Sequence, residues 1–503
     1  MGNHKKLLQF LRPDPAPAAK SSPSTSSDSD DDGGGGGGYD DDAYSPPTTS
    51  SPSTSASAAT SAAASPYRMS PWTRLPGLGF GADDEHAVAK QQTGLLGSLV
   101  KEDGHVYSLA AAGDLLYTGT DSRNVRVWRD RRECGGFRSG SGLVKAIVVA
   151  ADGRIFTGHQ DGKVRVWRRR AGNDDDGDAA AVVEHRRVGT LPRLRDVVAS
   201  SLLPSRYVRT TRRRRRSELW LRHFDAVSCL SLDADAGLLY SGSWDKTVKV
   251  WRVADSRCLE SVPAHDDAVN AVAAAGFDAL LFTGSADGTV KVWRREETVE
   301  NNKKASRRTK HSMERVLRSG DGAVTAIAVA AEARVVYVGS SDGAVTHWQF
   351  RRGGSSARNG GALRGHKMAV LCLAVAAGRV VVSGSADRTI CVWRREEGGA
   401  AHGRLAVLSG HAGPVKCVAM DEEVEEDADA DGARRWVVYS GSLDGSVKVW
   451  RVSDDARGGS GTMMTPARTP ARVWKGAAAA PPSPLSAWTP YAAAPETKRM
   501  AAA

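Results

Sequence analysis

The chain has 503 residues, and its 69 lysines and arginines against 58 aspartates and glutamates leave a formal net charge of +11. It contains no run of eighteen apolar residues, and its start, MGNHKKLLQF, lacks a long apolar core, so we expect no transmembrane helix and no secretory signal. Its six cysteines include no CxxC pair and no Cys/His grouping, which argues against a zinc site and is typical of reduced cysteines in an intracellular protein.

The first and last segments of the chain are expected to be disordered tails. Residues 1–92 include a stretch from 12 to 66 that is almost entirely Pro, Ala, Ser, Thr, Asp and Gly, and residues 454–503 have a similar composition. Such segments bury too little apolar surface to offset the entropy lost on ordering. Ser-Pro and Thr-Pro pairs in both tails suit proline-directed kinases. The foldable part is therefore 93–453, which is ample for a large core.

Within 93–453, one motif recurs seven times: a short apolar strand, a tight turn and a second strand that ends in Trp. The spacing of these tryptophans fits a unit of about 42 residues, with insertions that we place at 170–217, 296–312 and 421–435. The copies are TGTDSRNVRVW (118–128), TGHQDGKVRVW (157–167), SGSWDKTVKVW (241–251), TGSADGTVKVW (283–293), VGSSDGAVTHW (338–348), SGSADRTICVW (383–393) and SGSLDGSVKVW (440–450).

Each copy has the chemistry of a β-hairpin. In the third copy, β-branched and apolar residues alternate on both sides of a turn at Asp245 and Lys246. Ahead of this hairpin, AVSCLSL (226–232) and LWLRH (219–223) predict two further strands, so we expect four short antiparallel strands in each repeat. One such sheet cannot bury both faces alone, whereas seven sheets stacked radially can. The sequence therefore predicts an all-β, seven-bladed β-propeller.

These units resemble WD repeats, whose blades contain a hydrogen-bonded tetrad. Its members are a His in the turn that leads into the blade, a Ser or Thr on the second strand, an Asp in the hairpin turn and a Trp on the third strand. Four repeats contain all four members: His223, Ser241, Asp245 and Trp251; His265, Thr283, Asp287 and Trp293; His366, Ser383, Asp387 and Trp393; His411, Ser440, Asp444 and Trp450.

Three repeats depart from this pattern, and we expect their blades to be looser. The first has Ser122 in place of the turn Asp, the second and fifth lack the His, and the fifth has Val338 in place of Ser or Thr. Because Trp450 ends the last third strand, the ring needs one more strand to close it. GLLGSLV (94–100) is the natural supplier.

The resemblance extends beyond the repeats to the plant JINGUBANG-like group of WD-repeat proteins, and it covers residues 65–453. It rests on SPYRMSPW (65–72), on the insertion that contains LPRLRDVVASSLLPSRYVR, and on the third repeat. In that insertion four apolar residues have helical spacing and predict a short amphipathic helix on the rim of the propeller. They are Leu194, Val197, Val198 and Leu202.

The same insertion ends in five consecutive arginines: Arg212, Arg213, Arg214, Arg215 and Arg216. A nuclear-import signal, a solvated loop and a nucleic-acid contact all stay open for this run. Without it the net charge would be +6, and an acidic stretch at 421–431 opposes the basic ones. Nucleic acid is therefore not expected to be the main ligand.

No motif in the chain predicts catalysis. The glycine run at 33–38 has no following strand or Lys, and neither GxSxG nor HExxH occurs. A catalytic Ser, His and Asp are needed once, whereas here they recur in four repeats at one spacing. We therefore predict that the protein is not an enzyme and needs no cofactor and no metal.

The resemblance to WD propellers implies where partners dock. In that family the residues just before the turn Asp and just after the tetrad His face the narrower mouth of the ring. Among them Phe224 and Trp244 stand out, because exposed aromatic residues are over-represented at interface hot spots. The candidate partner-binding residues are Phe224, Asp225, Trp244, Asp266, Gln160, Lys367, Met368 and Leu443.

The functional prediction is a monomeric, non-catalytic scaffold or adaptor of a plant regulatory pathway. We expect it in the cytoplasm and nucleus, with protein partners that include transcription regulators among the candidates, and with no membrane contact. One alternative is a substrate receptor of a cullin-RING ubiquitin ligase, although Arg rather than Asp follows six of the seven repeat tryptophans. Another is an RNA- or chromatin-associated propeller that uses the arginine-rich insertion.

Overall fold

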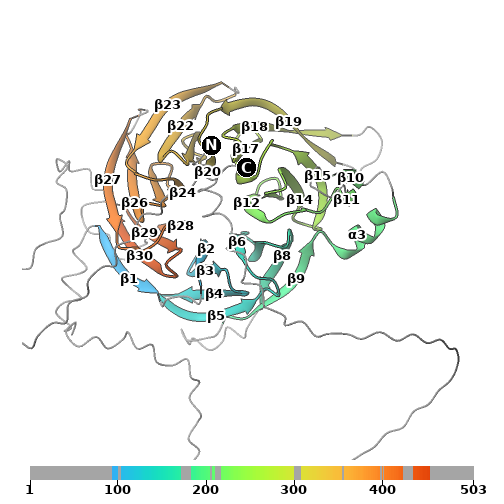
Figure 1. Ribbon diagram of the computed structural model, residues 1–503, viewed down its shortest axis with the longest axis horizontal. Helices are drawn as coiled ribbons and strands as arrows, with labels where there is room; N and C mark the ends of the chain where they lie inside the picture. Colours follow the sequence, from blue (N-terminus) through green and yellow to red (C-terminus); the bar gives the residue numbers. More distant parts are fainter. Residues whose placement is uncertain are drawn as a thin grey trace, which may run out of the picture. The chain divides into compact units, whose positions relative to one another are not determined.

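A computed structural model of the protein describes residues 93–99, 104–170, 183–203, 207–209, 217–299, 307–353, 356–396, 399, 401–422 and 434–453. In these residues, seven four-stranded antiparallel sheets are arranged as blades around a central axis, as Figure 1 shows. The seven-bladed β-propeller predicted from the repeats is confirmed. None of the described helices is both long and apolar enough to cross a membrane.

Apart from β1, the blade strands follow one another around the ring in chain order, with four strands in each blade. In blades 1 and 2 they are β2 (Val106–Ala112), β3 (Leu115–Thr120), β4 (Asn124–Arg129), β5 (Arg132–Arg138), β6 (Val144–Val149), β7 (Arg154–His159), β8 (Val164–Arg169) and β9 (His185–Leu191). In blades 3 and 4 they are β12 (Val227–Asp233), β13 (Leu238–Ser243), β14 (Thr247–Arg252), β15 (Arg257–Pro263), β16 (Val269–Ala274), β17 (Leu280–Ser285), β18 (Val290–Val299) and β19 (Arg307–Arg318).

Blades 5 and 6 contain β20 (Val324–Ala330), β21 (Val335–Ser340), β22 (Ala344–Phe350), β23 (Ala357–Arg364), β24 (Val370–Ala376), β25 (Val380–Ser385), β26 (Thr389–Arg395) and β27 (His402–Ser409). Blade 7 consists of β28 (Val415–Glu422), β29 (Arg435–Ser442), β30 (Val447–Ser453) and β1 (Gly94–Leu99). Between blades 2 and 3 lie α3 (Leu194–Ser201), β10 (Tyr207–Arg209) and β11 (Ser217–Leu219). In every blade the first strand is the innermost (Figure 1).

Small residues on the second strands let neighbouring blades approach closely. In blade 3 a Cβ added to Gly242 would lie 2.8 Å from Val269 of blade 4, closer than real Cβ contacts come. The same pairing of a second-strand glycine with the next blade's first valine occurs at every junction, including Gly441 with Val106 between blades 7 and 1. The Gly in each repeat therefore makes room for the core of the next blade.

The ring is closed by strands from the two ends of the described chain. β1 pairs with β30 in antiparallel register from Gly94 with Arg451 to Leu99 with Val447. It supplies the fourth strand of blade 7, as expected for residues 94–100. Leu99 is only 5% exposed and packs with Val106 and Leu109 of blade 1, so the closing strand also joins the core between these two blades.

The structure differs from the sequence prediction around the first insertion. The range 170–217 contains β9, which is the outer strand of blade 2. LWLRH (219–223) belongs to no blade, because Leu219 pairs with Tyr207 in the separate hairpin of β10 and β11. The segment was misassigned because its apolar residues resemble those of a strand, whereas β9 carries arginines and faces solvent.

The second insertion, 296–312, is also built differently from a plain loop. Its two ends extend β18 and β19 beyond the blade, where Arg294 pairs with Ser312 and Val299 with Arg307. The insertion expected at 421–435 begins and ends within β28 and β29, since Asp421 and Glu422 pair with Val437 and Trp436.

Candidate functional site at the mouth of the propeller

Four blades contain the same hydrogen-bonded tetrad. In blade 3, His223 Nδ1 lies 2.9 Å from Asp245 Oδ2, and its Nε2 lies 2.8 Å from Ser241 Oγ. Trp251 Nε1 donates to the same Ser241 oxygen at 2.9 Å. The tetrad therefore joins the turn before the blade, the second strand, the hairpin turn and the third strand.

The other three tetrads repeat this geometry within a few tenths of an ångström. The His to Asp distances are 3.0 Å for His265 and Asp287, 3.1 Å for His366 and Asp387, and 3.1 Å for His411 and Asp444. The corresponding tryptophans donate to the Ser or Thr oxygen at 2.9, 3.0 and 2.8 Å.

The tetrad carboxylates are held in the ionised form. Burial alone would raise the pKa of the Asp245 carboxyl, but the charge of and hydrogen bond from His223, with a further bond from Thr247, outweigh it and hold this pKa well below its usual range. The pKa of Asp444 falls to about 2 in the same way, with hydrogen bonds from Ser446 as the main opposing cause. For the imidazole of His366, burial alone would lower the pKa. Its hydrogen bond to Asp387 outweighs burial and raises this pKa to about 9.

Each tetrad aspartate also fixes the backbone that forms the mouth, the end of the ring at which the tetrad turns lie. The backbone N–H that follows the tetrad His donates to the aspartate: Phe224 at 3.0 Å, Asp266 at 3.1 Å, Lys367 at 2.9 Å and Ala412 at 2.8 Å. Four equivalent positions around the mouth are thus held rigidly. Their side chains are aromatic, acidic, basic and small.

In blade 2, which lacks the tetrad His, another histidine takes over its hydrogen bond to the second strand, and the sequence pattern did not indicate this. His159, from strand β7 itself, places Nε2 2.8 Å from Thr157 Oγ1, the oxygen that also accepts from Trp167 Nε1 at 2.9 Å. Burial, with the nearby Arg165 charge, lowers the pKa of His159 to about 3, so this imidazole is neutral. Arg165 in turn binds both carboxylate oxygens of Asp161, the turn Asp of this blade.

Blades 1 and 5 use other substitutes. In blade 1, Ser122 bonds to Thr120 Oγ1 at 2.7 Å and accepts from the Asn124 backbone, which closes the turn without a carboxylate. At the entry to blade 5, Arg318, the last residue of β19, donates to the carbonyl of Gly322 and to Ser340 Oγ and forms an ion pair of 3.7 Å with Asp342. The departures from the pattern are therefore compensated by local hydrogen bonds and an ion pair.

The structure places seven of the eight candidate partner-binding residues at the mouth with accessible side chains. Asp266, Lys367 and Met368 are exposed, and Met368 has 46% of its surface accessible. Four others are half-buried: Phe224, Asp225, Gln160 and Leu443.

Trp244 differs from the sequence prediction, because it is not an exposed aromatic. It is only 9% exposed and belongs to a buried cluster with alanines of blades 3 to 6, among them Ala226, Ala286 and Ala386. The ammonium of Lys145, from blade 2, lies 4.3 Å from the centre of its ring. Trp244 is therefore part of the buried interior of the ring and is not an exposed contact on its surface.

The repeated Ser, His and Asp cannot act as a catalytic set in these positions. Ser241, Thr283, Ser383 and Ser440 are all 0% exposed, and each hydroxyl is occupied by a Trp N–H and a His ring nitrogen. No three His, Cys, Asp or Glu side chains of the described residues are grouped so that they could hold a metal ion.

Buried tyrosines on the second strands of alternate blades bond to histidines on the outer strand of the next blade. The hydroxyl to Nε2 distances are 3.3 Å for Tyr117 and His185, 3.2 Å for Tyr240 and His311, and 2.8 Å for Tyr337 and His402. Sequence reasoning missed these pairs, although the tyrosines recur at one place in the repeats, as in LLYTG, LLYSG and VVYVG. They tie three of the blade junctions together.

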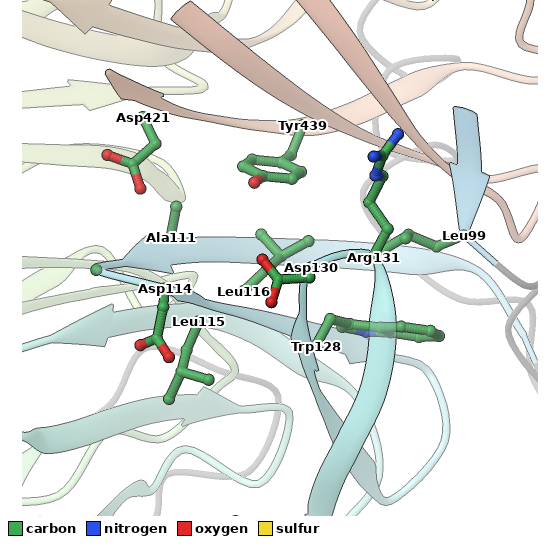
Figure 2. A pocket seen from close by; sticks show the side chains of 11 residues that line it. Leu99, Ala111, Asp114, Leu115, Leu116, Trp128, Asp130, Arg131, Asp421 and Tyr439 are labelled. Atoms are coloured by element: carbon green, nitrogen blue, oxygen red, sulfur yellow. The ribbon is translucent and has the colours of Figure 1, made fainter. Parts of the chain in front are cut away.

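Between blades 7 and 1, the equivalent Tyr439 lines a small pocket. Blade 1 turns at Asp130 and Arg131, and the pairing of β4 with β5 ends at Arg129 and Arg132, so β5 has no residue at the position of these histidines. Figure 2 shows three acidic side chains, those of Asp114, Asp130 and Asp421, among the residues that line this pocket with Tyr439. Burial, followed by the charge of neighbouring Glu422, raises the pKa of Asp421.

The five arginines, Arg212 to Arg216, lie outside the described residues, as do both predicted tails and most of the acidic stretch 421–431. The helix expected in the same insertion is present as α3, with Leu194, Val197 and Val198 on it and Leu202 at its end.

Comparison with known proteins identifies repeats of the family described as "WD domain, G-beta repeat" at residues 96–129, 132–168, 217–252, 256–294, 358–394 and 403–451. These matches leave out residues 324–350 of blade 5, the repeat in which both the His and the Ser or Thr are replaced.

Two curated proteins are similar over part of their length. The chain is 28% identical over 175 residues to the zinc finger CCCH domain-containing protein 17 of Oryza sativa subsp. japonica, which covers 35% of this chain and 31% of that protein. It is 27% identical over 192 residues to the WD repeat-containing protein pop1 of Schizosaccharomyces pombe, which covers 34% and 23%. The chain thus spans less than a third of either relative.

Among solved structures, the WD40 β-propeller domain of Doa1 is similar with a TM-score of 0.48 and 19% sequence identity. The match covers 71% of this chain and 96% of that domain.

Proposed function

The chain belongs to the WD40-repeat family, and we propose that it is a non-catalytic scaffold that binds protein partners at the mouth of its propeller. The observation that carries this proposal is the set of four mouth positions whose backbone is fixed by tetrad aspartates. A rigid surface loses little conformational entropy on binding, so contacts made there contribute efficiently to affinity. Buried, saturated tetrads thus position the exposed residues that follow them.

The side chains at the mouth favour a partner segment of mixed chemistry. Asp266 at the entry to blade 4 and Lys367 at the entry to blade 6 offer opposite charges, while Phe224 and Met368 offer apolar contact. Opposite charges give specificity and orientation, and the aromatic and apolar groups give most of the affinity. A peptide loop or tail of another protein has this combination, whereas a nucleic acid would meet the acidic Asp225 and Asp266.

We also propose the finer assignments made from the sequence. The segment SPYRMSPW and the insertion before the third repeat support membership of the JINGUBANG-like group and a role in a plant regulatory pathway. The arginine run supports a location in both the cytoplasm and the nucleus, because a cluster of positive charge of this kind can act as a nuclear-import signal.

The proposal is tested by affinity capture of the tagged full-length chain from plant extract, with quantitative mass spectrometry. The mouth variant combines Asp266→Lys, Lys367→Glu and Met368→Ala. A matched control combines Asp235→Lys, Arg132→Glu and Val407→Ala, which change an exposed acid, base and apolar residue away from the mouth. We expect a set of proteins that is lost with the mouth variant and kept with the control. The same captured proteins from all three chains would contradict the proposal.

A further inference from the structure

The helix α3 exposes its apolar residues to solvent. Leu194 is 78% exposed, Val198 53% and Leu202, just after the last helical residue, 76%. These residues are four apart in sequence, so they lie along one side of the helix. Leu203 is 49% exposed as well, and none of the residues of α3 is buried.

Polar contacts, and not apolar burial, hold α3 against the propeller. Arg193, just before the helix, donates to both carboxylate oxygens of Asp196 at 2.7 and 2.9 Å. Its guanidinium also donates to the carbonyl of Asp255, in the turn between β14 and β15, at 2.6 Å. Arg193 and Asp196 are 17% and 29% exposed, so this clamp lies on the side of the helix that faces blade 3. The apolar side is thereby turned outward in a fixed orientation.

The apolar side of α3 lies in a positively charged part of the surface. Residues 185–203 and 252–257, which form β9, α3 and the turn that Arg193 contacts, contain six arginines and two aspartates. Asp196 is paired with Arg193, and Asp255 with Arg252 at 3.5 Å. Four further arginines, all exposed, add their charge to this region: Arg186, Arg187, Arg195 and Arg257.

We propose that this surface, which we call the α3 face (Leu194, Arg195, Val198, Leu202 and Leu203), is a docking site for an acidic amphipathic helix of a protein partner. The apolar residues of such a helix would cover the exposed leucines, in the way that one amphipathic helix packs along another. Its carboxylates would meet Arg195 and the arginines of β9. α3 stands outside the ring, beside β10 and β11 (Figure 1).

The composition of the α3 face distinguishes this occupant from two others. Helices that lie in a membrane surface combine a basic face with bulky anchors such as Trp or Phe, and LRDVVASS contains neither aromatic residue. A second copy of the chain would bring its own arginines to the contact, and like charges would repel. An acidic amphipathic helix can cover the exposed leucines with its apolar side and pair its carboxylates with the arginines.

The test uses the full-length chain and two fluorescent helical peptides of about 16 residues with identical leucine positions at helical spacing. At all the positions that are not leucine, one peptide has Glu and the second has Lys. We expect the acidic peptide alone to bind, as measured by fluorescence anisotropy, and its binding to weaken as salt is raised. The double variant Leu194→Ser and Leu202→Ser, and separately Arg195→Glu, should each raise the Kd about tenfold or more.

Two substitutions are the matched controls: Val407→Ser, which changes an apolar residue that is 48% exposed on β27, and Arg132→Glu, which changes an exposed arginine on β5. Both should leave the Kd within about twofold of that of the unaltered chain. The proposal is overturned if neither peptide binds, if both bind equally, or if the leucine variant binds as well as the controls. If the chain binds phosphatidylserine vesicles and the leucine variant does not, the α3 face is assigned to a membrane instead. If the chain forms a dimer in sedimentation equilibrium and the leucine variant does not, the α3 face is assigned to a second copy.

Discussion

The carboxylate of Asp245 shows how one buried side chain determines the shape of the mouth. It accepts hydrogen bonds from His223, from the backbone of Phe224, and from both the backbone and hydroxyl of Thr247. Its side chain is 3% exposed, so water cannot replace these bonds if the carboxylate is removed. The spacing of His, Ser, Asp and Trp in the sequence was enough to predict these partners, because each lies at a fixed position in its repeat.

Asp245→Ala should therefore lower the free energy of unfolding by about 3 kcal/mol, because the buried donors of His223 and Thr247 lose their acceptor. Asp121→Ala is the comparison. Asp121 lies one position early in its repeat and is only half-buried, so we expect a cost of less than about 1 kcal/mol. Urea denaturation measures both, and equal losses would show that the alignment of the repeats is wrong.

His159 should make the protein sensitive to acid. Its pKa is about 3 in the folded chain, below the ordinary value of 6.5, so between these values only the unfolded chain takes up the proton. The stability that the neutral imidazole contributes to the folded chain is complete above pH 6.5 and is lost as the pH falls toward 3. From pH 7 to pH 5 we expect this residue to reduce the free energy of unfolding by about 2 kcal/mol.

The measurement is the pH dependence of unfolding of the unaltered chain and of His159→Gln, whose amide can still bond to Thr157. The variant should lose about 2 kcal/mol less between pH 7 and pH 5. Identical slopes for the two chains would refute the assignment of a buried, neutral imidazole. No feature of the repeat alignment indicated this role, because His159 occupies a position that is serine in most other repeats.

The four strands of a blade were not equally predictable. The first three carry alternating apolar residues, since both faces of the sheet pack on neighbouring blades. The outer strands face solvent along one edge: β9 exposes Arg186, Arg187 and Val188, and β23 contains two glycines. Such strands lack the period of two that marks a strand in a sequence, so the sequence of β9 is not distinguishable from that of an inserted loop. Pairing with the third strand, and not apolar patterning, defines them.

The closing strand gives the clearest test among the elements. A chain that begins at residue 101 lacks β1, which exposes the edge of β30 and the core contact of Leu99. It should lose at least about 3 kcal/mol in free energy of unfolding and should aggregate more readily. A chain that begins at residue 93 keeps β1 and is the control. Equal stability of the two truncated chains would contradict closure of the ring by β1.

The assembled ring presents surfaces that no single repeat encodes. Trp244 illustrates the limit of sequence reasoning: its place before the turn Asp predicted the mouth, but its burial depends on Lys145 and on alanines from other blades. The α3 face is the reverse case, since the helical spacing of its apolar residues was visible in the sequence and their exposure was not. The mouth and the α3 face together give the scaffold two separate places for partners.

The distribution of the protein between compartments tests the role proposed for the arginine run. Replacing Arg212 to Arg216 with glutamine should lower the nuclear share of a fluorescent fusion, because importins recognise clustered positive charge. Thermal melting of the purified chain should stay unchanged. An unaltered nuclear share would remove this role from the run.

The claim that the mouth binds protein is tested most directly by titrating the purified chain with a captured partner and, separately, with RNA and duplex DNA, each at two salt concentrations. We predict that Phe224→Ala and Met368→Ala each weaken the binding of the partner by about 2 kcal/mol, because desolvated apolar contacts provide the affinity. The affinity of the partner should change little with salt. Trp244 is left intact, since it supports the ring. Binding of the nucleic acids alone, weakening steeply with salt and unaffected by either substitution, would contradict the account.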